Sequence, residues 1–177
     1  AFTSYLEQLR NIGVDIVTRN DSKLANDFEV KISDAVRLCR EICSFELRWI
    51  LRQYRETEKL SDELTIWVEM AEKLTLEDYR MALATRAHMR QALAEVAPTT
   101  DAFITLASVG PAPDIDFHAD SGESEYAFLT GDPAFNAATS ALGAPAITLP
   151  KIAVNGMPLG VQVRGAPHHD WELTNLA

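Results

Sequence analysis

The chain has 177 residues, of which 47% are hydrophobic and 24% are charged, so it has the composition of an ordinary globular domain with a sizeable core. Its 26 acidic and 16 basic residues give a formal net charge of -10, which would repel a phosphate backbone and argues against a nucleic-acid partner. The chain lacks both an apolar run of membrane-spanning length and a signal-peptide pattern, so we expect a cytoplasmic protein with no membrane partner.

The first sixty residues are predicted to be mostly helical. Helical spacing of apolar residues predicts a helix over residues 1–12, with Gly13 as a left-handed cap, and residues 14–17 predict a short strand. Residues 26–54 predict one long amphipathic helix. Its apolar positions recur at steps of three and four: Val36, Cys39, Cys43, Leu47, Ile50 and Tyr54.

Two further helices are predicted before residue 99. Ser61 is placed to cap a helix that contains Leu64 and Trp67. Thr75 and Asp78 have the spacing of a capping box, which predicts another helix that ends at Pro98.

Beyond Pro98 the pattern changes from helix to strand. Residues 102–107 form an apolar run of strand length, and a long loop rich in proline, glycine and acidic residues is expected over 110–131. Asp132 followed by Pro133 predicts the start of a short helix that ends at Gly143.

Two buried strands are predicted near the C-terminus, over residues 146–149 and 159–163. Residues 151–154 and the Asn155-Gly156 turn connect them. Helices enclosing a few strands define an α/β fold class, in which a helical layer from residues 1–98 packs on strands of a mixed sheet from residues 99–177.

The candidate metal ligands do not form a convincing site. Cys39 and Cys43 lie four residues apart without a second ligand pair, so we expect buried thiols. Residues 114–125 have the acidic spacing of a calcium loop, but Ala119 replaces the required glycine and His118 takes a ligand position. The pair His168-His169 before Asp170 is interpreted as part of a helix cap. We therefore expect no metal and no cofactor.

Two adjoining segments resemble consecutive blocks of the amidase signature family. Residues 131–150 are similar to the block in which a short helix ends in Gly-x-Pro and continues into a strand that ends in proline. Residues 155–163 are similar to the following Gly-x-Pro-x-Gly-x-Gln strand, here with Leu159, Gly160 and Gln162, and residues 170–176 to the start of the C-terminal helix.

The resemblance extends over most of the chain. Residues 74–80 and 101–106 are similar to the helix and strand that precede these blocks in the family. Two departures bear on the substrate: Ser140 stands where many members have asparagine, and residues 107–110 replace a Thr-Pro pair.

The resemblance implies hydrolysis of a carboxylic amide C–N bond. Family members use a serine nucleophile, a second serine in a cis peptide and a lysine, a Ser-Ser-Lys variant of acyl transfer. These residues belong to the part of the family chain that precedes the matched region, and this sequence has no Gly-Gly-Ser-Ser run. No catalytic residue is therefore expected here, and the chain is interpreted as the C-terminal portion, residues 1–177, of a single amidase domain.

The resemblance also implies a role for the helix after Pro133, which borders the substrate channel in similar enzymes. Asn136, Thr139 and Gly143 recur on it at helical spacing, so we predict that they form one wall of the substrate pocket. The alternative is that Asn136 bonds a loop backbone and Thr139 its own helix.

Two other functions stay open at this stage: an amidotransferase subunit of the same family, and a helical binding module without catalysis. The chain starts at Ala1 without methionine and stops within a predicted helix, so we expect a fragment that is inactive alone. A small-molecule amide is the expected substrate of the parent enzyme. Exposed strand edges make a homo-oligomer possible for the fragment.

Overall fold

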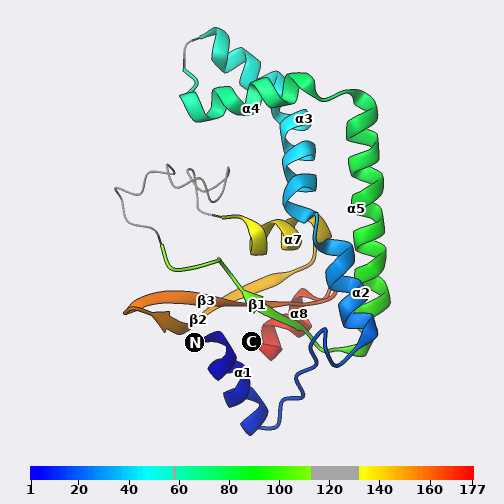
Figure 1. Cartoon of the computed structure of the whole chain (residues 1–177), viewed down its shortest axis with the longest axis vertical. Coiled ribbons are helices and arrows are strands. Elements are labelled where there is room, and N and C mark those ends of the chain that lie inside the picture. The colour runs from blue at the N-terminus through cyan, green and yellow to red at the C-terminus, as the bar shows by residue number, and fades with distance from the viewer. Residues whose placement is uncertain (58, 113–131) are drawn as a thin grey trace.

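A computed structural model describes residues 1–57, 59–112 and 132–177, and its elements define an α/β fold (Figure 1). The helices and strands follow one another as α1 (Phe2–Asn11), α2 (Lys23–Ile32), α3 (Ala35–Glu56), α4 (Asp62–Lys73), α5 (Leu76–Val96), a 3-10 turn (Ala97–Thr99), β1 (Phe103–Leu106), α7 (Ala134–Leu142), β2 (Ala146–Val154), β3 (Met157–Arg164) and α8 (Asp170–Leu176).

The predicted helix ends are confirmed where a capping residue marks them. Gly13 follows α1 with a φ of 95°. The Ser61 side chain accepts a hydrogen bond from the Leu64 amide at the start of α4. Thr75 and Asp78 form the full capping box at the start of α5, which ends just before the turn that contains Pro98.

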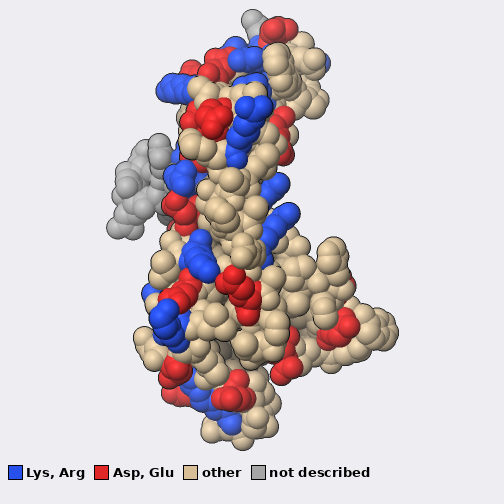
Figure 2. Space-filling view, turned by 90° about the vertical axis from the view of Figure 1, so that its right-hand side faces the viewer, with Lys and Arg blue, Asp and Glu red and all other residues tan. Residues whose placement is uncertain are grey.

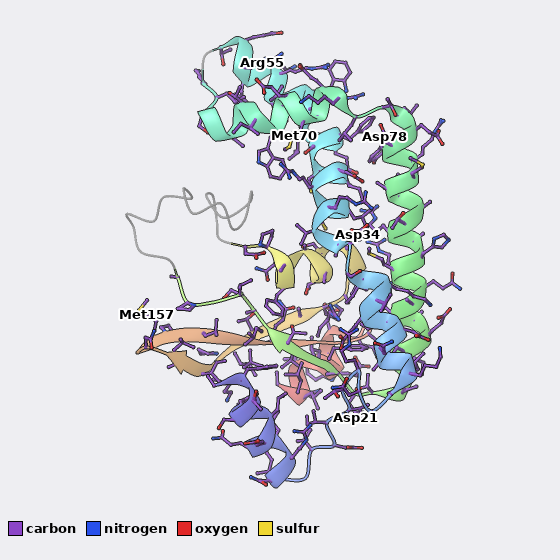
Figure 3. The ribbon with its side chains drawn as sticks, in the orientation of Figure 1. Asp21, Asp34, Arg55, Met70, Asp78 and Met157 are labelled. Atoms are coloured by element: carbon purple, nitrogen blue, oxygen red, sulfur yellow. The ribbon has the colours of Figure 1, made fainter. Side chains whose placement is uncertain are left out.

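The single long helix predicted over residues 26–54 is wrong, because the chain forms α2 and α3 with a break at Ser33 and Asp34 (Figure 3). The Ser33 hydroxyl donates to the Val30 carbonyl at 2.8 Å, a local bond that competes with the helical ladder. Apolar residues keep their helical spacing across this break, so periodicity alone does not reveal it.

The strand predicted over residues 14–17 is also wrong. These residues have no regular secondary structure, and the side chains of Val14 and Val17 are exposed. A strand requires a hydrogen-bonded neighbour, and the described residues provide none for this segment.

The sheet has three strands in the order β1-β3-β2, with β3 in the centre. Both ladders are antiparallel, so the mixed sheet that we expected is not seen in the described residues. Asn155 and Gly156 form the two-residue turn with φ values of 51° and 80°, which places Met157 at the hairpin tip (Figure 3). Residues 151–154 belong to β2 itself, and the pairing register with β3 shifts between Leu149 and Ile152, as at a β-bulge.

The helices cover the sheet unequally. Helices α3 and α5 stand side by side and α4 crosses their far end, while α2 continues below α3 alongside the lower part of α5 (Figure 1). Helix α7 lies between α3 and the sheet, and α1 lies on the opposite side of the sheet. The main core lies among these helices. Its largest members are Phe28, Leu38, Ile42, Met89, Leu93 and Leu142. The tilted rings of Phe28 and Phe103, 5.2 Å apart between centroids, connect α2 to β1.

Acidic and basic side chains alternate over the face shown in Figure 2, without a large area of one sign. In the described part of the chain, no helix combines the length and the apolar composition that crossing a membrane requires.

Candidate functional site

Helix α7 is held against the long helices by two side chains. The Cys39 thiol of α3 donates to the Ala137 carbonyl at 3.3 Å, and Nε of Arg90 in α5 donates to the Ala141 carbonyl at 3.3 Å. Burial raises the pKa of the Cys39 thiol, with a smaller contribution from Cys43, so the thiol keeps its proton and stays a donor. Cys43 is exposed, which corrects the expectation of two buried thiols.

The chain leaves α7 by a sharp change of direction. Gly143 has a φ of 63°, the left-handed cap that the sequence predicts, and Pro145 follows two residues later, just before β2 begins at Ala146. A Cβ atom on Gly143 would lie 2.7 Å from Nη2 of Arg90. The Pro145 carbonyl accepts a hydrogen bond from the Gly165 amide at 3.0 Å, which joins this exit to the end of β3.

A polar row crosses the sheet beneath α7. Thr105 of β1 and Thr148 of β2 are both in register with Gln162 of the central strand, so the three side chains emerge on one face. From above, the Thr139 hydroxyl of α7 donates to the Gln162 amide oxygen. We call Thr105, Thr139, Thr148 and Gln162 the threonine–glutamine cluster.

Gly160 gives the cluster room. A Cβ atom at this position would lie 2.5 Å from Cγ2 of Thr148 and 2.9 Å from Cβ of Ala107, which are closer than van der Waals contact. Gly160 therefore allows the neighbouring strands to place their side chains over β3.

The three predicted pocket residues take different positions on α7. Thr139 faces the sheet and contacts Gln162, with a second, long contact to the Phe135 carbonyl at 3.5 Å. Asn136 is exposed, and Gly143 is exposed at the helix end beside Arg90. Only Thr139 is thus brought to another polar side chain, and the role of all three as a pocket wall stays a prediction.

Thr105, Thr148 and Gln162 are the cluster residues that the sequence did not lead us to predict, although Gln162 belongs to the quoted Gly-x-Gln motif. The Gln162 side chain is 5% exposed, and its amide nitrogen donates no hydrogen bond to a described residue. The sequence does contain an indication of this site. A glutamine at the centre of a predicted buried strand requires polar partners, because burying an amide group without hydrogen bonds is destabilising.

The described residues offer hydrogen-bonding groups but no activated nucleophile. None of their serine hydroxyls or cysteine thiols bonds to a histidine, lysine or carboxylate, the arrangement that nucleophilic catalysis requires. His169 is at the N-cap of α8 without a side-chain capping bond, and its Nδ1 lies 3.8 Å from Glu172. The candidate calcium loop, residues 114–125, lies outside the described residues.

A sequence model of the family described as Amidase matches residues 1–174. A search among curated proteins found no match.

Solved structures gave clear similarities. One described as an amidase is 27% identical, with a TM-score of 0.69 over 82% of this chain. Two further structures share the fold. One is a 6-aminohexanoate cyclic dimer hydrolase complexed with substrate, which is 18% identical with a TM-score of 0.59 over 86% of this chain. The other is a bacterial aryl acylamidase of the amidase signature family, which is 18% identical with a TM-score of 0.56 over 82% of this chain. This chain covers 34%, 40% and 32% of those three chains, respectively.

Proposed function

The chain belongs to the amidase family, and on this premise we propose that residues 1–177 are the C-terminal part of an enzyme that hydrolyses a small carboxylic amide. The family match over residues 1–174 is the observation that carries the proposal. The described residues contain no activated nucleophile, which supports the proposal that the reacting groups come from polypeptide outside this chain.

The chemistry follows the family pattern of two serines and a lysine. The neutral lysine accepts a proton from the nucleophilic serine through the bridging serine, and the serine oxygen attacks the amide carbon. The C–N bond breaks, the leaving amine takes the proton, and water then hydrolyses the acyl-enzyme to release a carboxylic acid. This route requires no metal and no cofactor.

In this proposal the threonine–glutamine cluster borders the acyl pocket. Because the Gln162 amide oxygen already accepts from Thr139, the orientation of the amide is defined and its two N–H groups are left as donors. Such donors are suited to a carbonyl oxygen of the substrate or of a neighbouring backbone. Thr139 acts here as a positioning residue for Gln162.

The test is an assay of the purified chain with aliphatic and aryl amides and detection of the released amine. We expect no turnover, because nucleophile, bridging serine and lysine are all supplied from elsewhere. Turnover that persists after repurification and is abolished by changing one serine of this chain would contradict the proposal. A variant in which Ser140 is replaced by alanine is the natural first control, since Ser140 lies on α7 next to Thr139.

A further inference from the structure

Arg164 is a buried cation at the end of the central strand. It is the last residue of β3 and is 4% exposed. It lies two residues after Gln162 in the same strand and is in register with Phe103 of β1 and Ala146 of β2. Alternation along a strand places Arg164 on the same sheet face as Gln162, beneath the helices.

Two aromatic rings surround the guanidinium group. Its central carbon lies 5.2 Å from the ring centroid of Phe103 and 5.8 Å from that of Phe28 in α2. Stacking on aromatic rings offsets part of the loss of hydration, but it satisfies none of the five N–H donors of an arginine.

The described residues provide no acceptor for these donors. Nε is fully enclosed and makes no hydrogen bond, and no carboxylate forms an ion pair with Arg164. Burial alone lowers the pKa of Arg164 to about 10, so the group is still charged at neutral pH. A charge that is both buried and unpaired is strongly destabilising, and it implies an anion that the described residues do not contain.

We propose that Arg164 is a binding site for a small carboxylate anion. A planar carboxylate matches the flat, forked guanidinium group through two parallel N–H···O bonds. A phosphate dianion is bulkier, and it is repelled more strongly by a chain with a net charge of -10. The site is independent of the proposed hydrolysis, because Arg164 is given no part in the reaction.

The test compares thermal unfolding in sodium formate and in sodium chloride at equal ionic strength. Formate should raise the melting temperature of the wild type, by about 3–6 °C at ten times its dissociation constant and then with the logarithm of its concentration, whereas chloride should not. Arg164→Met and Arg164→Lys should both lose this response. The Arg164→Lys variant keeps the positive charge but lacks the paired N–H donors of the guanidinium group, so it tests whether charge alone is sufficient. The matched control is Arg80→Met, which removes an exposed arginine of α5 and should keep the full response.

Arg164→Met should fold and unfold in chloride at a temperature at least as high as the wild type, because it removes an unpaired buried charge. A second readout needs no stable variant: the Nε–H resonance of Arg164 in a nitrogen-15 spectrum should shift with formate and saturate with the same dissociation constant that the melting temperatures give. An unmoved resonance, a formate response retained by Arg164→Met, or a larger response to phosphate than to formate would each overturn the proposal. If longer carboxylates such as hexanoate bind more tightly than formate, the carboxylate of a larger free acid is the preferred ligand.

Discussion

At the scale of single residues, the contact between Thr139 and Gln162 connects α7 to the sheet and defines the candidate site. The two side chains are 23 positions apart in sequence, and neither helical nor strand periodicity predicts that they meet. Thr139 can be predicted from the sequence because it shares a helix face with Asn136 and Gly143, on a helix that borders the substrate channel in similar enzymes. Its partner cannot be predicted in this way, since a partner depends on how the helix packs on the sheet.

Replacing Thr139 by valine keeps the side-chain volume but leaves the Gln162 amide oxygen buried without its donor. We expect the free energy of unfolding to fall by about 1–3 kcal/mol. Adding Gln162→Leu to this variant should lower the free energy of unfolding by less than the same change does in the wild type, because the two side chains interact. Urea unfolding of the four proteins in this cycle measures the coupling.

The matched control is Thr85→Val in α5, where the hydroxyl bonds only to the Met81 carbonyl of its own helix. This change should alter the free energy of unfolding by less than about 0.5 kcal/mol. Equal costs for Thr139→Val and Thr85→Val, with no coupling to Gln162, would show that the cluster is not a structural unit.

Gly143 is a second single residue with a specific requirement. Its φ of 63° is unfavourable for a β-branched residue, and a Cβ atom would displace Arg90 from the end of α7. Gly143→Val should therefore cost about 1–3 kcal/mol of unfolding free energy. Gly110→Val is the control, because Gly110 has no positive φ and no atom within 4 Å of its would-be Cβ. Similar stabilities of the two variants would refute this explanation of the helix exit.

At the scale of elements, the sequence predicts best those boundaries at which a side chain bonds to the backbone nearby. The Ser61 cap, the capping box at Thr75 and the turn at Asn155 are of this kind, because a few consecutive residues determine them. The break at Ser33 is also local, but the continuous apolar spacing from Phe28 to Leu38 hides it. The segment 14–17 has β-branched residues without a neighbouring strand, so propensity alone predicts it incorrectly.

The capping box of α5 should depend on pH. Hydrogen bonds from the Thr75 side chain and then from its backbone amide lower the pKa of Asp78 below its usual value of 3.8. A carboxyl group with a lowered folded-state pKa stabilises the fold above 3.8 and loses this contribution as the pH falls through the folded-state value.

Thr75→Ala should lower the melting temperature by about 2–4 °C at pH 7. The difference from the wild type should shrink progressively below pH 3.8, as Asp78 becomes protonated in the folded state. Glu77→Ala serves as the control for an acidic first-turn residue outside the box. If the melting temperatures of the wild type and Thr75→Ala differ by the same amount at pH 3 and pH 7, the Asp78 carboxylate does not stabilise the start of α5.

At the scale of the whole molecule, the sheet is small and its outer strands are β1 and β2. Within the described residues each of these strands has one unpaired side, and large apolar side chains are exposed elsewhere, among them Ile12 at 77%, Trp171 at 74% and Trp49 at 64%. Unpaired edges and exposed apolar residues favour association with another chain.

We therefore expect the 177-residue chain to form a dimer or a larger assembly at micromolar concentration. Light scattering over a dilution series should show the mean mass falling with dilution, and a hydrophobic dye should bind to the dissociated chain. A monomer at every concentration that binds no dye would contradict this expectation.

We propose that this chain is the C-terminal part of an amide hydrolase whose nucleophile lies outside residues 1–177. The most direct measurement is fluorophosphonate labelling of the polypeptide translated from the complete reading frame that encodes these residues, followed by peptide mass spectrometry. We expect one labelled serine, on a peptide N-terminal to Ala1 and within a glycine- and serine-rich stretch. A label on a serine within residues 1–177, or a reading frame that yields no labelled serine at all, would contradict it.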